Sequence, residues 1–407
     1  MIQCVRVYIL GAESMKYKNA SSILPQELVE LIQEYVQGEY IYIPVRDKYV
    51  GESATEYKNE LEKRDAHIYI NYLEGMSNKC LSEIYHLSES SIRRIIIKQR
   101  KGYTEMNDNI RNLLFHWGLQ NCQVKQIYNS TWQVGEEYVL KVYENIEGLE
   151  RNLKILHILG EMNIPVGKVV PANDKKQYIA SDNVYYFMSK KLLGNNIVRI
   201  GNDMSIAVTM GEIIADLHMA FKKCEDADVF WNNSLLEEMN GWVKSNLESS
   251  GWKHLGKEEY EKVISQLATV YDELPVQLIH RDVHFGNFLF SEGNFSGYID
   301  FDLSQKNIRI FDLCYFLLGL LSEEEKLEIT KERWFEFVKN VFLGYEKKLE
   351  LYEAEKKAVP YVMECIELLF VAYFDSVNDV GCAENAYKLF EFVKNQEKRI
   401  WKSTNEF

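Results

Sequence analysis

The segment LIHRDVHFGNFLF (residues 278–290) and the shorter segment GYIDFD (residues 297–302) decide how the rest of this chain is interpreted. They place a carboxylate at Asp282, an amide at Asn287 and a second carboxylate at Asp300. Apolar residues flank these positions and predict a loop and two strand ends that hold the three side chains in place. Carboxylate and amide oxygens are ligands that Mg²⁺ prefers. The two segments therefore predict metal-assisted phosphoryl transfer.

Each of the three polar side chains has an expected role in that reaction. Asp282 would orient the acceptor hydroxyl and take its proton. Asn287 and Asp300 would supply oxygen atoms to Mg²⁺ ions that bridge the phosphates of ATP. An isolated Asp or Asn is more often a loop cap, so the prediction depends on finding all three at this spacing.

The pattern H-x-D-x-x-x-x-N, which begins at His280, and the later I-D-F-D resemble the aminoglycoside-phosphotransferase-like kinases. This family includes choline kinases, type II homoserine kinases and spore-coat-associated kinases. The resemblance covers about residues 104–407 and implies a two-lobed, protein-kinase-like α+β fold with a small β-rich lobe and a large helical lobe. It also implies that Asp302 touches metal or supports the loop, and that Asp312 braces the catalytic loop. His280, together with His218, would belong to the framework.

The resemblance further implies a nucleotide-binding lysine at Lys141, within the apolar segment VLKV (residues 139–142). In kinases a glutamate on the following helix holds this lysine. The best register places Asn152 at that position instead. Glu150 or Glu147 would then have to substitute, and we expect Glu150 to do so.

Two further positions are expected to contact ATP. The turn at residues 129–132 resembles the phosphate-covering hairpin of the family, in which the backbone amides of Ser130 and Thr131 would cover the phosphates. The segment YFMSK (residues 186–190) resembles the strand that joins the lobes, whose backbone near Met188 would bind adenine. Neither a G-x-G-x-x-G nor a G-x-x-x-x-G-K-[ST] motif occurs in the chain, which disfavours Rossmann-type and Walker-type sites.

Residues 15–103 resemble a different group, the small Mor-activator-like helix-turn-helix proteins. The resemblance lies in Leu24-Pro25, in GEYIYIP (residues 38–44) and in LSESSIRR (residues 87–94). It implies DNA binding through the last helix, with candidate contacts at Ser90, Ser91, Arg93, Arg94 and Lys98. A helical docking module with a solvated basic face is the alternative.

Apolar spacing and turn residues predict the secondary structure. In the front domain, helices are expected at 24–36, 56–73 and 77–85 and after a cap at 88–91, and 102–109 is expected to be a linker. Further strands are expected at 124–128, 132–134, 138–142, 166–170, 178–180 and 184–189. The clearest further helices are expected at 148–159, 204–221, 258–274 and 361–377.

Length and charge support a division into domains. The 407 residues carry a net charge of −14, all of it in residues 104–407, because residues 1–103 hold equal numbers of acidic and basic side chains. We predict an N-terminal extension (1–14), a helix-turn-helix-like domain (15–103), a small lobe (104–195) and a large lobe (196–407). The acidic larger part disfavours general nucleic-acid binding and is compatible with a cationic substrate.

The seven cysteines are scattered without a C-x-x-C pair, and no apolar run reaches the roughly 20 residues that cross a bilayer. Reduced thiols in a cytoplasmic protein without a signal peptide are therefore expected. Two main functions stay open, and the sequence does not separate the first of them from a third, a protein or spore-coat kinase. The first is a kinase that phosphorylates a hydroxyl of an aminoglycoside, amino alcohol or similar small molecule. The second is a one-component transcriptional regulator whose kinase-like domain senses a nucleotide or metabolite.

Overall fold

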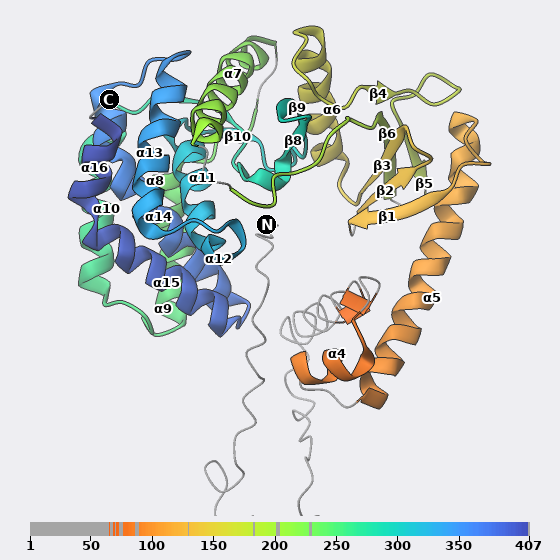
Figure 1. Ribbon diagram of the computed structural model, residues 1–407, viewed down its shortest axis with the longest axis horizontal. Coiled ribbons are helices and arrows are strands. Elements are labelled where there is room, and N and C mark those ends of the chain that lie inside the picture. Colours follow the sequence, from red (N-terminus) through yellow and green to blue (C-terminus); the bar gives the residue numbers. More distant parts are fainter. Residues whose placement is uncertain are drawn as a thin grey trace, which may run out of the picture. The chain divides into compact units, whose positions relative to one another are not determined.

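The structure is a computed structural model, drawn as a ribbon in Figure 1. It describes residues 65, 68–69, 71–72, 76–85, 89–128, 130–181, 184–200, 204–227 and 230–405. The helix predicted at 24–36 lies outside the described residues, as does most of the one predicted at 56–73. The chain divides into two compact units, one ending at Asn109 and the other starting at Ile110.

The described part of the front unit contains α4 (Asn78–Ile84) and the beginning of α5 (Glu89–Leu113). Both helices were predicted. Ser77 caps α4, because its hydroxyl accepts a hydrogen bond from the backbone N–H of Cys80 at 3.2 Å. The buried apolar side chains of this unit form a small cluster of Ile68, Tyr69, Leu81, Ile92, Ile95 and Ile96.

The linker predicted at 102–109 is wrong, since these residues lie inside α5. The polar composition of the segment suggested a break, but it contains no proline. Its single glycine, Gly102, costs only about 1 kcal/mol relative to alanine in a helix. Helical apolar spacing then resumes at Ile110 and Leu114, both fully buried.

The small lobe is built on an antiparallel sheet with the strand order β1-β2-β3-β6-β4, to which β5 adds by pairing with β6. The strands are β1 (Val124–Tyr128), β2 (Thr131–Val134), β3 (Tyr138–Tyr143), β4 (Val169–Val170), β5 (Tyr178–Ser181) and β6 (Val184–Lys190). The helix α6 (Ile146–Glu161) follows β3, and Asn145 caps it. Trp132, Leu140 and Met188 form much of the buried core of the sheet.

The strand predicted at 166–170 is confirmed only for Val169–Val170. The preceding residues pair elsewhere: Val166 forms an isolated bridge with Tyr298, whose N–H donates to the carbonyl of Pro165 at 2.9 Å. This segment therefore connects the small lobe to the second half of the predicted catalytic motif.

The large lobe is helical, as predicted. Its helices are α7 (Ser205–Ala227), α8 (Leu235–Glu238), α9 (Lys244–Ser249), α10 (Lys257–Tyr271), α11 (Ile310–Ser322), α12 (Glu324–Leu327), α13 (Lys331–Glu346), α14 (Glu353–Ser376), α15 (Val380–Asn395) and α16 (Glu397–Asn405). None of the described helices is long and apolar enough to span a membrane.

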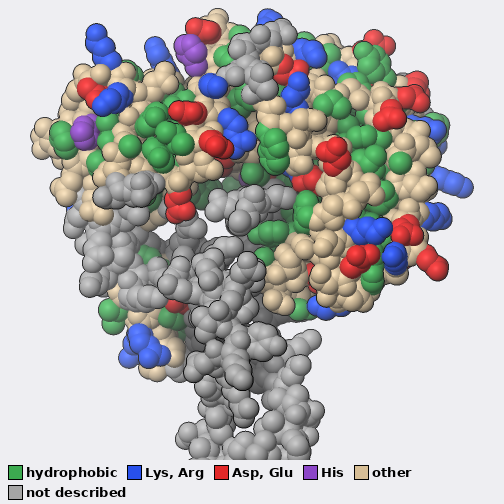
Figure 2. All heavy atoms as spheres, turned by 180° about the vertical axis from the view of Figure 1, so that it is seen from behind, with side chains coloured by type: hydrophobic (Ala, Val, Ile, Leu, Met, Phe, Trp, Pro, Cys, Tyr) green, Lys and Arg blue, Asp and Glu red, His purple; other side chains and the backbone are tan. Residues whose placement is uncertain are grey.

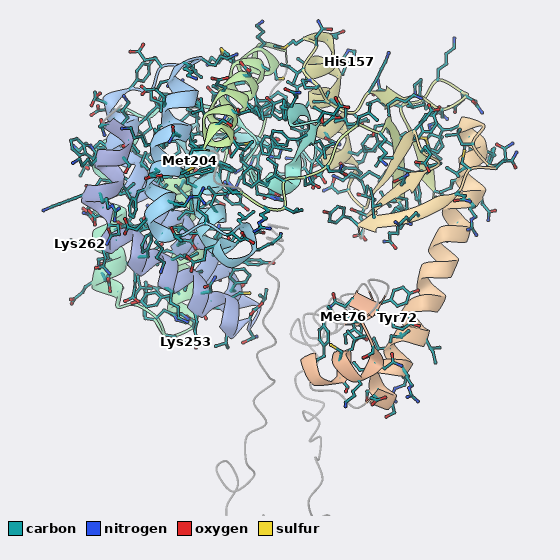
Figure 3. The ribbon with its side chains drawn as sticks, in the orientation of Figure 1. Tyr72, Met76, His157, Met204, Lys253 and Lys262 are labelled. Atoms are coloured by element: carbon teal, nitrogen blue, oxygen red, sulfur yellow. The ribbon has the colours of Figure 1, made fainter. Side chains whose placement is uncertain are left out.

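Helices α7 and α13 cross at two glycines. A Cβ atom on Gly211 would lie 2.0 Å from the carbonyl oxygen of Val341, and one on Gly344 would lie 2.0 Å from that of Val208. Met204 directly precedes α7 and lies beside α13 (Figure 3). Its sulfur accepts a hydrogen bond from the guanidinium of Arg333 at 3.9 Å. The backbones approach closely because neither glycine carries a side chain.

Four short strands lie between the helices of the large lobe. β7 (Val276–Ile279) pairs with β10 (Gln305–Ile308), and β8 (Phe288–Ser291) pairs with β9 (Asn294–Tyr298). A 3₁₀ turn (Phe285–Asn287) precedes β8. The chain thus has a β-sheet lobe and a helical lobe, which confirms the predicted mixed fold. The predicted catalytic residues lie at the ends of these short strands.

Candidate functional site

The loop after β7 is held by Asp312 on α11. The carboxylate of Asp312 accepts hydrogen bonds from the backbone N–H groups of His280 and Arg281, each at 2.8 Å. Arg281 has a positive φ of 67°, which is a strained conformation for a residue with a side chain. Its guanidinium lies 2.6 Å from the carboxylate of Glu238 on α8. Asp312 therefore has the bracing position that the family resemblance implied.

The two predicted framework histidines are fully buried. His218 contacts the hydroxyl of Tyr345 at 2.8 Å and the carboxylate of Asp312 at 3.1 Å. His280 lies 3.2 Å from the carbonyl oxygen of Ile299. These contacts join α7, α11, α13 and the segment after β9 around the catalytic loop.

Asp282 follows the braced residues and is held by side chains from two other elements. Tyr315 on α11 donates its hydroxyl to Asp282 Oδ1 at 2.9 Å. Asn287 donates its Nδ2 to Asp282 Oδ2 at 3.1 Å and to the Asp282 carbonyl at 2.9 Å. The amide nitrogen of Asn287 is thereby committed to Asp282, which fixes the direction of its side-chain oxygen.

The electrostatic surroundings keep Asp282 ionised. Burial alone would raise the pKa of Asp282, but its interaction with His284 lowers that pKa to about 2. Burial would lower the pKa of His284, yet the Asp282 carboxylate raises it above its ordinary value. His284 also accepts a hydrogen bond from the Gly286 N–H at 3.0 Å. Asp282 is therefore a weak base with a fixed orientation, suited to positioning a hydroxyl group.

Lys141 on β3 meets the second half of the motif. Its Nζ lies 2.7 Å from Asp300 Oδ1 and 2.6 Å from Asp302 Oδ2. Asp300 has a positive φ of 66° and lies two residues after the end of β9. Burial would raise the pKa of Asp300, but the charge of Lys141 lowers it, whereas burial raises the pKa of Asp302. The charge of Asp282 also acts on Asp300, so the two halves of the motif share one electrostatic environment.

The predicted ion pair between Lys141 and a glutamate on α6 is not found among the described residues. Among the described residues Lys141 forms its ion pairs with Asp300 and Asp302, and neither Glu150 nor Glu147 is paired with it. Both glutamates are exposed to solvent. Asn152 is the residue that α6 turns inward, because it occupies the buried face of the helix together with Leu149, Leu153 and Leu156.

The predicted ATP contacts differ in their accessibility. Ser130 is exposed, and its carbonyl accepts from the Val142 N–H at 2.8 Å; Thr131 pairs with Lys141 across the sheet. Met188 is fully buried and registers with Leu140 on β3 and Val170 on β4. Its backbone therefore lies between two strands, which disfavours the expected adenine contact at Met188 itself.

Two site residues were missed in the sequence. Tyr143 lies two positions after Lys141 on β3, and its hydroxyl donates to Asp302 Oδ1. Tyr315 lies three positions after Asp312 on α11. Strand period and helix period place each tyrosine on the same side of its element as a residue already singled out. That spacing was the available signal.

The donor set fits a divalent cation. The ammonium of Lys141 already lies between two carboxylates, so the position favours positive charge. The Asp300 side chain is 46% exposed, which leaves it accessible to a ligand. No group of three or more His, Cys, Asp or Glu side chains in the described ranges surrounds a common point. The Mg²⁺ site predicted at Asn287 and Asp300 would thus need further oxygen ligands, such as the phosphate oxygens of a nucleotide.

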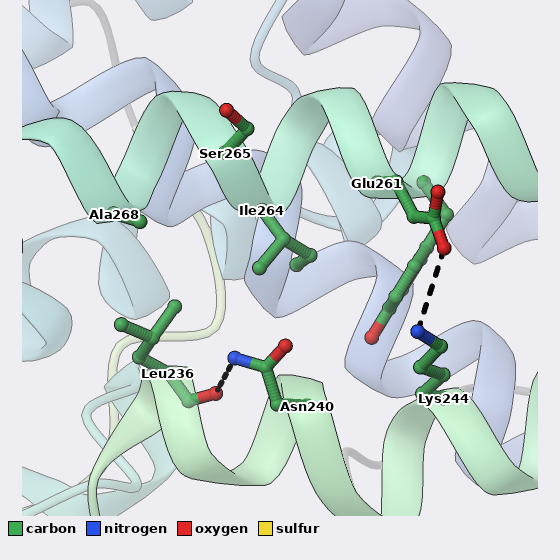
Figure 4. Close-up of a pocket in the computed structure, with 8 residues that line it drawn as sticks. Leu236, Asn240, Lys244, Glu261, Ile264, Ser265 and Ala268 are labelled. Atoms are coloured by element: carbon green, nitrogen blue, oxygen red, sulfur yellow. Dashed lines mark hydrogen bonds and ion pairs between the residues drawn. The ribbon is translucent and has the colours of Figure 1, made fainter.

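A shallow hollow lies elsewhere in the large lobe, between α10 and the segment from α8 to α9 (Figure 4). Lys244 and Glu261 face each other across it at 3.5 Å, and Asn240 donates to the Leu236 carbonyl at 2.9 Å. None of the predicted site residues lines it.

Comparison with known proteins identifies the family. The sequence pattern of the phosphotransferase enzyme family (APH) matches residues 124–355, more than half of the chain. The chain belongs to this phosphotransferase family. The prediction that it is a phosphotransferase is thereby confirmed.

Individual proteins show more limited similarity. The homoserine kinase of Gluconobacter oxydans (strain 621H) is 27% identical over 186 residues, which are 43% of this chain and 55% of that enzyme, so the match spans about half of its length. The uncharacterized protein YraL of Bacillus subtilis (strain 168) is 37% identical over 86 residues, which are 20% of this chain and 97% of that protein.

A solved structure has a similar fold. It is an amicoumacin kinase, hAmiN, in complex with AMP-PNP, Ca²⁺ and Ami, with 18% sequence identity and a TM-score of 0.54. The similarity covers 74% of this chain and 96% of that chain. It supports the two-lobed fold of this phosphotransferase.

Proposed function

We propose that this phosphotransferase moves the γ-phosphoryl group of ATP to a hydroxyl of a small molecule such as an aminoglycoside or amino alcohol. The observation that supports this most is the meeting of Lys141, from the sheet of the small lobe, with Asp300, next to the catalytic loop of the large lobe. The solved amicoumacin kinase carries a nucleotide analogue and a divalent cation, which favours the same ligand classes for this chain.

In this proposal Asp282 accepts a hydrogen bond from the acceptor hydroxyl and directs its oxygen toward the γ-phosphorus. With a pKa of about 2, Asp282 takes the proton late, once the hydroxyl has become acidic by bonding to phosphorus. Tyr315 and Asn287 hold the carboxylate during this step. Asn287 and Asp300 would hold Mg²⁺, which would supply charge neutralisation for the phosphate oxygens.

Lys141 would bind the nucleotide phosphates. Its ammonium is already oriented by Asp300 and Asp302, and the backbone amides of Ser130 and Thr131 would cover the phosphates from the β1–β2 turn. We also propose a cytoplasmic location, since the six cysteines in the described part of the chain are free thiols.

The test is a turnover assay with Mg-ATP and a panel of aminoglycosides, choline, homoserine and sugars. We expect ADP release that depends on one class of acceptor. Asp282→Ala should lower kcat by about 10²-fold or more, the range for losing a positioned acid–base group. Asp174→Ala, which removes an exposed turn carboxylate, is the control and should keep wild-type turnover. Equal activity of both variants would refute the role of Asp282.

A second function, DNA binding by the front unit, is favoured by one observation. On α5 the side chains of Arg93 and Arg94 are exposed, whereas Ile92, Ile95 and Ile96 are buried. The helix thus turns its apolar side into the unit and its arginines to solvent. The side chain of Lys98, the third basic residue among the predicted contacts, lies outside the described residues. A regulator that senses nucleotide would bind Mg-ATP without turnover on any acceptor.

A further inference from the structure

Helix α6 is linked to the carboxylate of Asp302 indirectly, through Tyr143 on β3. Asn152, at the position where a glutamate was expected, is 4% exposed. Its Nδ2 donates a hydrogen bond to the hydroxyl oxygen of Tyr143 at 2.9 Å. The helix therefore reaches β3 without placing a negative charge beside Lys141.

The hydrogen bonds that continue from Tyr143 converge on the carboxylate of Asp302 from two sides. The phenolic oxygen accepts from Asn152, and the phenolic proton goes to Asp302 Oδ1. Asp302 uses its other oxygen, Oδ2, to bind Lys141 at 2.6 Å. A carboxylate can only accept and an ammonium can only donate. Asn152 and Lys141 are thus the outer donors, Tyr143 accepts from one neighbour and donates to the next, and Asp302 accepts from both sides.

The chain of contacts ends at the proposed metal ligand. Lys141 also bonds Asp300 Oδ1 at 2.7 Å, so the ammonium holds Asp300 and Asp302 at a set separation. Because Tyr143 and Asn152 fix Asp302, they also restrict where Lys141 and Asp300 can lie. Partners behind a ligand commonly control metal affinity in this way.

We propose that Asn152 and Tyr143 are positioning residues that set the geometry of Lys141 and Asp300 for the metal–nucleotide complex, in place of a lysine–glutamate ion pair. This inference rests on the function proposed above. In this arrangement an uncharged side chain links α6 to the site. The ammonium of Lys141 forms its ion pairs with the two aspartates and not with a residue of the helix.

A purely structural role would leave a different signature. The ring of Tyr143 packs against Phe187, with ring centroids 5.9 Å apart, and this contact survives in Tyr143→Phe. Asn152→Asp keeps the shape of the side chain but replaces the donor with an acceptor. The aspartate then competes with Asp302 for the proton of Tyr143. Both variants change the hydrogen bonds of Tyr143 while keeping the ring contact with Phe187.

The experiment measures binding of Mn²⁺·AMP-PNP to the full chain by calorimetry, together with kcat and KM for Mg-ATP. We expect each variant to weaken binding of the metal complex by about 10-fold, the lower end for partners behind a ligand. KM for Mg-ATP should rise more than kcat falls. The double variant should bind about as weakly as either single one, because both substitutions act through Asp302.

Tyr178→Phe is the matched control, since it removes a hydroxyl from a partly buried tyrosine in the same sheet. It should bind the complex like the wild type. If the Tyr143 and Asn152 variants unfold at lower urea concentration yet bind Mn²⁺·AMP-PNP as tightly as the wild type, their role is structural and the inference is overturned. Failure of the wild type itself to bind the complex would instead refute the proposed function.

Discussion

Glu364 on α14 is fully buried, and its two carboxylate oxygens receive no hydrogen bond from the described part of the chain. Burial, together with the nearby charge of Glu397, raises the pKa of Glu364 to about 8. An ordinary glutamate in the unfolded chain titrates near 4.5. The folded protein therefore binds a proton at Glu364 over a pH range where the unfolded chain does not.

The sign of the pH dependence follows from this difference. Because the pKa is raised on folding, the stability that it contributes is complete below pH 4.5 and is lost as the pH rises through about 8. Glu364→Gln cannot ionise and should escape the loss. We expect the variant to unfold at higher urea concentration than the wild type at pH 8.5 and at a similar one at pH 5. A difference that is constant with pH would contradict the assignment.

At the scale of elements, the two glycines between α7 and α13 make a prediction about packing. Gly211→Ala would bring a methyl group against the Val341 carbonyl and the Tyr345 amide, at 2.0 and 2.6 Å before any adjustment. Because both contacts are backbone atoms, the helices must separate, at a cost of about 1–3 kcal/mol or more.

Gly319→Ala on α11 provides the control, since a Cβ there meets nothing within 4 Å. Alanine is favoured over glycine in a helix by about 0.5–1 kcal/mol, so this variant should be slightly stabilised. Urea unfolding curves of the two variants should therefore shift in opposite directions. A shift of both in the same direction would show that the close crossing does not determine the result.

The elements also show which structure could be predicted from sequence. The strands at 124–128, 138–143 and 184–190 alternate or carry β-branched residues, and the turns between them are marked by polar residues and glycine. The linker error at 102–109 had the opposite cause, because local polarity cannot reveal that buried residues on both sides continue one helix. Pairing of Val166 with Tyr298 depends on residues more than 100 positions apart and leaves no local pattern.

Candidate site residues could be predicted where they lie close together in the sequence. Asp282, Asn287 and Asp300 stand out in two short sequence segments, and their roles in binding metal and substrate stay predictions. That Lys141 pairs with Asp300 and Asp302 rather than with a glutamate of α6 was not predictable, because it depends on which face α6 turns toward β3. The burial of Met188 between two strands was not predictable for a similar reason, since it is a property of the whole sheet.

At the scale of the whole molecule, the distribution of charge along the chain bears differently on the predicted kinase activity and on the predicted DNA binding. The net −14 lies in residues 104–407. On the face shown in Figure 2, acidic and basic side chains are interspersed over the described surface. Any DNA binding should therefore come from the few arginines of α5 and should be weak and strongly dependent on salt.

A gel shift with promoter DNA, repeated over a range of salt concentrations, tests this expectation. Arg93→Ala and Arg94→Ala should each weaken binding and lower the salt dependence by about one phosphate contact. Lys253→Ala, in the large lobe, should leave it unchanged. Binding that is insensitive to both arginine variants would rule out the predicted contact helix.

The positive φ angles of Arg281 and Asp300 limit how far this protein can be made more heat-tolerant. Glycine at either position would relieve about 1 kcal/mol of backbone strain and would be an attractive choice for an engineer. The same exchange would delete the buried partner of Glu238 or the carboxylate that meets Lys141. At Arg281 the loss of the buried ion pair with Glu238 would cost more than the relieved strain. Thermal robustness and turnover are therefore set against each other at Asp300 alone of these two positions.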